Sequence, residues 1–270
     1  MTSCFNAACN LSRGCTGVSH SGGKDIQMSR LLLISNSTLH GSGYLDHAET
    51  EIRDFLKGAT RVAFVPFALY NRNQYATQAR DRFHRMGYEL MSVHDVSHPQ
   101  RAIKEADAIF VGGGNTFRLL KGLYDWELRE VIRDVVAQGR PYVGSSAGSI
   151  VACPTLKTTK DMPIVQPPSF EALGLASFQI SPHYLDPDPS STHMGETQEQ
   201  RIVQFLEENE APVVGLREGG LLRVEAGQVI LRGPRSARIF RRGYQPIEAS
   251  PEIDLAPLLD QNALPEGCAS

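Results

Sequence analysis

Residues 108–148, AIFVGGGNTFRLLKGLYDWELREVIRDVVAQGRPYVGSSAG, contain the alternation that decides the fold. The apolar run 108–111 ends in three glycines, two helical patterns follow, and the run 141–144 leads into a second glycine-flanked turn. Short apolar runs are typical of strands that are buried on both faces of a sheet. Two such strands joined by helices predict parallel pairing through a right-handed crossover.

The same alternation continues on both sides of this stretch. Upstream, the sequence predicts strands over 31–34, 62–65 and 88–93 and helices over 45–56, 75–86 and 99–105. Downstream, it predicts an irregular excursion over 153–174, strands over 178–180 and 213–216, a helix over 197–207 and an antiparallel meander from 221 to 240. We therefore expect an α/β fold, a three-layer sandwich with a mostly parallel, doubly wound sheet and an antiparallel carboxyl-terminal extension.

The chain divides by composition into one ordered region and two ends. Residues 1–29 are rich in Ser, Gly and Cys and lack an apolar secretory segment, so we expect a disordered amino-terminal extension. Residues 30–245 are expected to form a single α/β domain, because no linker or internal repeat interrupts them. The proline-containing segment 246–270 is expected to be a poorly ordered tail.

Composition and charge exclude several classes of protein. The 270 residues carry a formal net charge of -3, which argues against a nucleic-acid binder. No apolar run approaches the roughly 18 residues of a membrane helix. The five cysteines are odd in number and favour free thiols in a reducing compartment, so we expect a cytoplasmic protein. The cysteine and histidine spacing predicts no metal site.

The sharpest motif is Gly144-Ser145-Ser146-Ala147-Gly148. It matches G-x-S-x-G between a predicted strand and a helical stretch, which is the context of a nucleophile elbow. The glycines allow a tight turn that lifts a serine hydroxyl above the carboxyl edge of the sheet. The pattern places the nucleophile at Ser146 and predicts that the N–H of Ala147 faces a developing oxyanion. The alternative is a glycine- and serine-rich turn without chemistry.

A serine nucleophile needs a base, and His183 is the best placed of the eight histidines. It follows the predicted strand 178–180, and ligands of open α/β sheets bind at the carboxyl ends of strands. His193, in a loop rich in Ser and Thr, is the main alternative. Glu218 follows the next predicted strand and is expected to orient the base; the alternative is a surface glutamate in a turn. The order Ser146, His183, Glu218 is similar to that of class I glutamine-amidotransferase-like folds.

The run Gly112-Gly113-Gly114-Asn115-Thr116 leaves a strand at the same predicted edge. It lacks the last glycine of G-x-G-x-x-G and has no G-K-[ST], so no nucleotide cofactor is expected. Consecutive small residues can turn their amides inward, and Gly113 or Gly114 is expected to supply a second oxyanion donor. The alternative is a plain strand-to-helix turn.

Five motifs occur together in a characteristic order. They are Gly112–Phe117 (GGGNTF), Gly144–Gly148 (GSSAG), Thr158–Val165 (TTKDMPIV), Ser181–Tyr184 (SPHY) and Gly195–Ile202 (GETQEQRI). With them, the chain resembles the peptidase E (α-aspartyl dipeptidase) family of serine peptidases, family S51, from about Leu31 to Phe240. The resemblance implies a hydrolase that cleaves dipeptides with an amino-terminal aspartate through an acyl-enzyme, without a metal or organic cofactor.

The resemblance also implies roles for individual residues. The implied catalytic residues are Ser146 as nucleophile, His183 as general base and Glu218 as third member, with Gly113, Gly114 and Ala147 forming the oxyanion hole. Asp161 is expected to help position the substrate. The other candidate substrate-binding residues are Asn115, Lys157, Gln198 and Arg201. The expected partner is a small dipeptide, and a homodimer is possible.

Two positions depart from the family pattern. The elbow often reads G-W-S-A-G, and here Ser145 replaces the tryptophan. The helix motif often reads G-E-T-R-E, and here Gln198 replaces the arginine, which puts strict aspartate specificity in question. Arg201, Lys157 or Lys160 could supply the missing charge.

Two other functions stay open at this point. One is a cyanophycinase-like hydrolase that acts on β-linked aspartyl-arginine. The other is a non-catalytic, amidotransferase-like module that binds a ligand, which the departures at positions 145 and 198 would permit.

Overall fold

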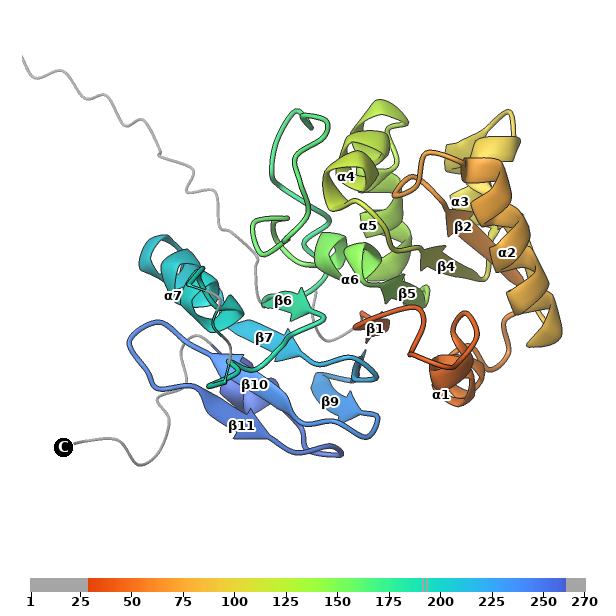
Figure 1. The fold of residues 1–270 in the computed structure, drawn as a ribbon. Coiled ribbons are helices and arrows are strands. Elements are labelled where there is room, and N and C mark those ends of the chain that lie inside the picture. Colours follow the sequence, from red (N-terminus) through yellow and green to blue (C-terminus); the bar gives the residue numbers. More distant parts are fainter. Residues whose placement is uncertain (1–28, 191, 193, 261–270) are drawn as a thin grey trace, which may run out of the picture.

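Two β-sheets form the framework of the protein (Figure 1). The computed structural model describes residues 29–190, 192 and 194–260. The strands are β1 (Leu31–Ile34), β2 (Arg61–Val65), β3 (Glu89–Ser92), β4 (Ala108–Val111), β5 (Tyr142–Ser145), β6 (Gln179–Pro182), β7 (Val213–Leu216), β8 (Leu221–Glu225), β9 (Gln228–Arg232), β10 (Ala237–Phe240) and β11 (Ile247–Ala249). The helices are α1 (Glu49–Phe55), α2 (Arg72–Arg85), α3 (Pro99–Glu105), α4 (Thr116–Asp125), α5 (Arg129–Ala137), α6 (Ala147–Ala152), α7 (Gln198–Glu208) and α8 (Ala256–Leu259), with 3-10 turns at Asp46–Ala48 and Val93–Asp95.

The larger sheet has seven strands in the order β3-β2-β4-β5-β1-β8-β9. The first five strands are parallel to one another. Strand β8 pairs antiparallel with β1, and β9 pairs antiparallel with β8. Because the strand order departs from the chain order, helices must cross over the sheet on both faces. The predicted α/β fold with a mostly parallel, doubly wound sheet is confirmed.

Side chains of the larger sheet alternate between two hydrophobic cores. Leu31 and Leu33 of β1 face the core that α3, α4, α5 and α6 cover. Leu32 and Ile34 face the opposite core, which is covered by α1 and α2. All four leucine and isoleucine side chains are fully buried. Burial on both faces explains why the strand sequences are continuous apolar runs rather than alternating ones.

The smaller sheet has four strands in the order β11-β10-β7-β6. Strands β6 and β7 are parallel, and β10 is antiparallel to both β7 and β11. Helix α7 lies against this sheet (Figure 1), where Ile202 and Leu206 pack with Val213 and Phe240.

The predicted meander from 221 to 240 is only partly right. The hairpin of β8 and β9 is confirmed, but β10 leaves β9 and pairs with β7 in the smaller sheet. Gly233, with a φ of 94°, and Pro234 separate the two strands. A glycine in the left-handed region followed by a proline redirects the chain, and local patterning does not reveal where the next strand will pair.

The expectation of a poorly ordered tail from residue 246 is wrong for 246–260. This segment forms β11 and α8, and Leu255 and Leu259 are buried in the core of the larger sheet. The carboxylate of Asp254 accepts hydrogen bonds from the N–H of Val229 (2.9 Å) and of Ala256 (3.0 Å). Pro257 stands in the first turn of α8, where a proline is tolerated because no helical hydrogen bond is lost. The predicted domain boundary at 245 is therefore too early.

The predicted disordered extension lies outside the described residues, except for Ser29, and so do residues 261–270. Four of the cysteines, Cys4, Cys9, Cys15 and Cys268, belong to these ends. Within the part of the chain that the structure describes, no helix is both long and apolar enough to cross a membrane.

The ordered tail makes a testable contribution to stability. Replacing the fully buried Leu255 by Ala should lower the free energy of unfolding by about 2–5 kcal/mol, because a core cavity is left behind. Replacing Ile253 by Ala, two residues earlier and 47% exposed, should change it by about 0.5 kcal/mol or less. Denaturant unfolding of both variants measures the difference. Equal, small effects would mean that the tail does not pack on the domain.

Candidate active site

Ser146 lies in a strained turn between β5 and α6. Its backbone has a φ of 51° and a ψ of -109°, a conformation that costs a non-glycine residue about 1–3 kcal/mol. The flanking glycines make this turn sterically allowed. A Cβ on Gly144 would lie 2.6 Å from the carbonyl oxygen of Gly148, and a Cβ on Gly148 would lie 2.1 Å from the carbonyl oxygen of Val111. The turn therefore has the geometry that a nucleophile elbow requires.

Three side chains from different loops converge at this turn. Ser146 Oγ lies 2.9 Å from His183 Nε2, and His183 Nδ1 lies 2.7 Å from Glu218 Oε1. With Nδ1 donating to the carboxylate, Nε2 is left to accept the serine proton. The side chains of His183 and Glu218 are 40% and 49% exposed, so a small molecule can reach them. The arrangement can activate a hydroxyl for attack on a carbonyl carbon.

The converging residues come from two sheets, where the sequence predicted a single edge. Ser146 follows β5 of the larger sheet, whereas His183 follows β6 and Glu218 lies two residues after β7 in the smaller one. Strands β6 and β7 are short and buried at every position, like the parallel strands of the larger sheet. Their run lengths and composition do not distinguish one sheet from two.

The fully buried side chain of Ser35 connects the two sheets at the site. Its Oγ donates to the carbonyl oxygen of Leu216 (2.8 Å) and accepts the N–H of His183 (2.9 Å). Its own N–H donates to the carbonyl oxygen of Gly220 (3.0 Å). Ser35 directly follows β1, so one residue ties the larger sheet to the loops that carry His183 and Glu218.

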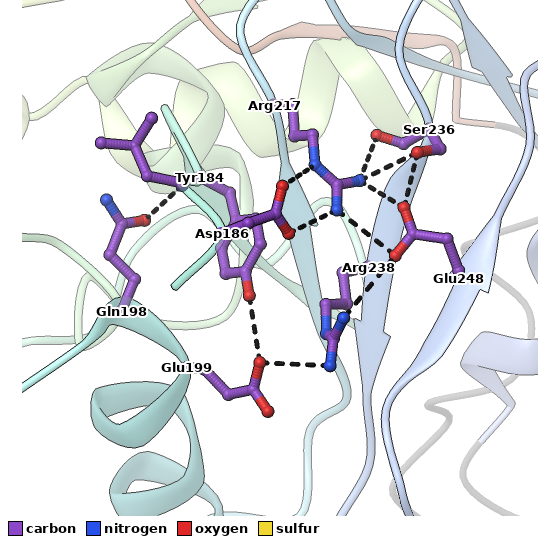
Figure 2. A network of polar contacts seen from close by, with 9 residues as sticks. Tyr184, Asp186, Gln198, Glu199, Arg217, Ser236, Arg238 and Glu248 are labelled. Carbon is purple, nitrogen blue, oxygen red and sulfur yellow. Dashed lines mark hydrogen bonds and ion pairs between the residues drawn. The ribbon is translucent and has the colours of Figure 1, made fainter. Parts of the chain in front are cut away.

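A network of charged groups holds these two loops from the other side (Figure 2). Arg217, next to Glu218 in the chain, donates two hydrogen bonds to Asp186 (2.9 and 2.6 Å), three residues after His183. The same guanidinium contacts Glu248 of β11 (2.5 Å). The hydrogen bonds from Arg217 hold the pKa of Asp186 below its usual value, so this carboxylate stays charged and bound. The loops after β6 and β7 are thereby fixed to each other.

Two of the predicted oxyanion donors, Ala147 and Gly113, lie beside the serine. Ala147 is the first residue of α6, where N–H groups have no partner within the helix. Gly113 packs on the nucleophile turn, since a Cβ there would lie 3.1 Å from Ser146 Cβ. The amide of Gly113 makes a backbone hydrogen bond to the hydroxyl of Tyr75, whose pKa is raised to about 12 by burial. The N–H of Ala147 is therefore open to a ligand, the N–H of Gly113 is engaged by Tyr75, and the role of Gly114 stays a prediction.

Asp161 and Asn115 join the irregular excursion to the start of α4. Asp161 Oδ2 accepts the N–H of Thr116 (2.7 Å) and its hydroxyl (2.6 Å). Asn115 caps α4 by accepting the N–H of Arg118 (3.0 Å), and its Nδ2 donates to the carbonyl oxygen of Met162 (2.9 Å). Both side chains hold the backbone beside the glycine run in place, and their predicted contact with a substrate stays a prediction.

Gln198 and Lys160 lie against the backbone of His183. Gln198 begins α7, and its amide donates to the carbonyl oxygen of His183 (3.2 Å) and accepts the N–H of Leu185 (3.1 Å). Lys160 Nζ donates to the carbonyl oxygens of Pro182 (2.7 Å) and His183 (3.1 Å). It also lies 3.2 Å from Gln198 Oε1. Gln198, which replaces the arginine of the family motif, therefore has the cation of Lys160 directly beside it.

The other two predicted cations are placed differently. Lys157 Nζ donates to Asn209 Oδ1 (3.0 Å), just beyond the carboxyl end of α7. Gln198 stands at the opposite end of this helix, roughly 16 Å away at 1.5 Å per residue. Lys157 therefore lies at the other end of α7 from Gln198, and its predicted contact with a substrate stays a prediction. Arg201 is exposed and pairs with Glu196 (3.8 Å).

No metal site accompanies these side chains in the described residues. Among them, no group of three or more His, Cys, Asp or Glu side chains is arranged to hold a metal ion. The alternative base His193 lies outside the described residues.

Comparisons with known proteins identify the family. The sequence model of peptidase family S51 matches residues 31–232. The chain belongs to peptidase family S51. A Peptidase E of Streptomyces coelicolor is 54% identical over 230 residues, which are 85% of this chain and 95% of that protein. A probable alpha-aspartyl dipeptidase of Drosophila melanogaster is 47% identical over 234 residues, 86% of this chain and 98% of that protein.

Solved structures agree with this S51 chain at the level of the fold. A putative Peptidase E protein from Listeria monocytogenes superposes with a TM-score of 0.59 at 22% identity, covering 77% of this chain and all of that one (100%). A peptidase from an acI-B1 Actinobacterium superposes with a TM-score of 0.63 at 17% identity, covering 85% and 98%. The class I glutamine-amidotransferase-like architecture expected from the order of the site residues is thus confirmed.

Two groups that support the S51 site were missed in the sequence. The sequence analysis did not single out Ser35, although a polar residue directly after a strand of a parallel sheet lies at the edge where sites form. Arg217 was passed over beside Glu218. No local signal identifies its partners, because Asp186 and Glu248 are each 31 residues away in the chain.

The link through Ser35 can be tested by stability. Replacing Ser35 by Ala leaves the N–H of His183 without its buried acceptor, while the carbonyl of Leu216 keeps the N–H of Tyr184, and the loss should cost about 1–3 kcal/mol. Replacing Ser37 by Ala is the matched control, because its side chain makes no hydrogen bond within the described part of the chain, and we expect about 0.5 kcal/mol or less. Chemical denaturation compares the two. If the variants are equally stable, the hydroxyl of Ser35 does not join the sheets.

Proposed function

We propose that this S51 peptidase is a serine dipeptidase that hydrolyses dipeptides with an amino-terminal aspartate. The observation that carries the proposal is the continuous hydrogen-bonded chain Ser146–His183–Glu218 on a strained strand-turn-helix elbow. Relatives named Peptidase E and probable alpha-aspartyl dipeptidase support the substrate class. An intact serine–histidine–glutamate set also favours an enzyme over the ligand-binding module considered from the sequence.

Acylation begins at the serine hydroxyl. His183 Nε2 removes the proton from Ser146 Oγ as the oxygen attacks the carbonyl carbon of the aspartyl residue. Glu218 holds Nδ1 and stabilises the imidazolium that forms. The N–H groups of Ala147 and Gly114 stabilise the negative oxygen of the tetrahedral intermediate. The C–N bond then breaks, and the imidazolium gives its proton to the leaving amine.

Deacylation repeats these steps with water. His183 removes a proton from a water molecule, whose oxygen attacks the aspartyl ester on Ser146. The ester C–O bond breaks, and the imidazolium returns the proton to Ser146 Oγ. Each proton taken by His183 is thus returned within the half-reaction, and free aspartate and a second amino acid are released.

The proposal includes a cytoplasmic location. Cys153 is a free, fully buried thiol, and burial raises its pKa to about 12. A neutral buried thiol is inert and suits a reducing compartment. The homodimer stays a prediction.

The proposed nucleophile predicts a large loss of activity. Replacing Ser146 by Ala should lower kcat for Asp-Leu by roughly six orders of magnitude, as for other serine hydrolases. Replacing Glu218 by Gln should lower it by about four, because the histidine loses the carboxylate that stabilises its charged form. Steady-state hydrolysis, with circular dichroism to check folding, measures both. Near-wild-type hydrolysis by the folded Ser146→Ala variant would refute the assignment.

A substrate panel separates the proposal from its rival. Asp-Leu, Asn-Leu, Ala-Leu and β-linked Asp-Arg differ in the charge and linkage of the first residue. We expect Asp-Leu to have the highest kcat/KM. A clear preference for β-linked Asp-Arg would support the cyanophycinase-like alternative.

A further inference from the structure

Lys160 places a positive charge at the rim of the catalytic site. Its ammonium lies 3.1 Å from the carbonyl oxygen of His183, the residue that contacts Ser146. The residue as a whole is exposed to solvent, while protein atoms around the ammonium remove part of its water. It adjoins Asp161 in the chain, and that carboxylate is held at the start of α4.

The ammonium of Lys160 has only neutral partners at hydrogen-bond distance. These are the carbonyl oxygens of Pro182 and His183 and the side-chain oxygen of Gln198. Among the described residues, no carboxylate lies within ion-pair distance of Nζ. Neutral oxygens orient the ammonium, but they do not compensate its charge. A carboxylate that reached this position would form a charge-assisted hydrogen bond, which is stronger than the contacts it now makes.

The arginines near this position are already paired with carboxylates. Arg217 contacts Asp186 and Glu248, and Arg238 lies 3.2 Å from Glu199 at the start of α7 (Figure 2). Arg201 is paired with Glu196. Lys160 therefore differs from these three cations in having no acidic partner.

Gln198 explains why the charge comes from position 160. The amide of Gln198 holds the backbone on both sides of Tyr184 and brings no charge to the site. Lys160 Nζ lies 3.2 Å from the end of this side chain. The cation that the family motif often supplies from α7 is thus replaced by one from the irregular excursion.

We propose that Lys160 is the specificity-determining residue that binds the side-chain carboxylate of the substrate's amino-terminal aspartate. This inference rests on the proposed dipeptidase function and adds the group that selects an acidic side chain. The carboxylate would take the place of Gln198 Oε1 as acceptor, and the two backbone carbonyls would keep the ammonium in position. Lys160 contacts the substrate but takes no part in proton transfer.

The charge of Lys160 also makes the selection depend on pH. The surrounding protein strips water from the ammonium and lowers its pKa to about 8, with a further lowering by Arg201. The carboxylates of Asp161 and Glu218 act in the opposite direction. The charged form is present below this pKa and is lost as pH rises through it. Preference for an acidic side chain should therefore weaken above about pH 8.

The test compares Asp-Leu with Asn-Leu, which has the same shape without the charge. Replacing Lys160 by Met should lower the ratio of kcat/KM values, Asp-Leu over Asn-Leu, by about ten- to a hundred-fold, the range of one hydrogen bond to a charged group. Lys160→Arg should retain the preference. Replacing the exposed Lys104 of α3 by Met is the matched control and should leave the ratio unchanged.

A pH series on the wild-type enzyme gives a reading that does not depend on any variant folding. Effects of pH on steps that the two reactions share act on both substrates and cancel in the ratio. The ratio should fall between about pH 7 and pH 9 in the wild type and stay level in Lys160→Arg. A ratio that is level in the wild type would overturn the inference.

The outcomes distinguish the inference from the proposed function. If Lys160→Met lowers kcat/KM equally for both substrates, Lys160 only positions His183 and the inference is wrong, while the dipeptidase function stands. If the wild type hydrolyses neither substrate, or hydrolysis survives in Ser146→Ala, the proposed function fails and the inference fails with it. Calorimetric binding of both dipeptides to Ser146→Ala, with and without Lys160→Met, checks the selection apart from catalysis.

Discussion

The contact between Ser35 and His183 is the constraint on which the site depends. The nucleophile stands on one sheet and its base on another, so the 2.9 Å between them is not set by either sheet alone. A single buried hydroxyl, donating to one loop and accepting from the other, fixes their separation. Buried polar groups with both functions satisfied specify one arrangement more sharply than apolar packing does. The precision of the site thus comes from a serine that takes no part in the reaction.

Two residues of the site share an unusual backbone. Ser146 and His183 both have φ values near 50°, in the left-handed region that non-glycine residues rarely adopt. Each strained residue is restrained by its surroundings. Ser146 is held by the close glycine contacts of its turn. The N–H of His183 donates to Ser35, while Gln198 and Lys160 donate to the carbonyl of His183 or the one before it. Strained backbone of this kind persists only where favourable contacts of the surrounding structure outweigh its energetic cost. Here the strained conformations direct the two side chains toward each other.

The local sequence contained most of the fold and the reacting groups. Four-residue apolar runs marked β1, β4 and β7 at the residues where the structure has them, because a strand buried on both faces has no polar position to break the run. The glycines around Ser146 marked the elbow because no larger residue fits there. These features depend on neighbours in the chain, and so a single sequence can reveal them.

Contacts between residues that are far apart in the chain could not be predicted from the local sequence. Three such contacts are the pairing of β10 with β7, the packing of α8 and the ion pairs of Arg217. Each joins segments that are separated in the chain by a loop or a whole strand. Prolines in 246–260 resembled those of a disordered tail, yet one of them begins a helix. Lys157 and Lys160, three residues apart, were equivalent candidates in the sequence for the missing positive charge. In the structure their ammonium groups lie at opposite ends of α7.

The anchoring of Asp161 has an electrostatic consequence for acidic ligands. A bare carboxylate near the catalytic residues would repel an incoming aspartyl side chain. Here the N–H and hydroxyl of Thr116, at the positive end of the α4 dipole, absorb much of that negative potential. The segment 159–161 therefore contains an acidic residue whose charge is largely compensated, so that it repels acidic ligands less.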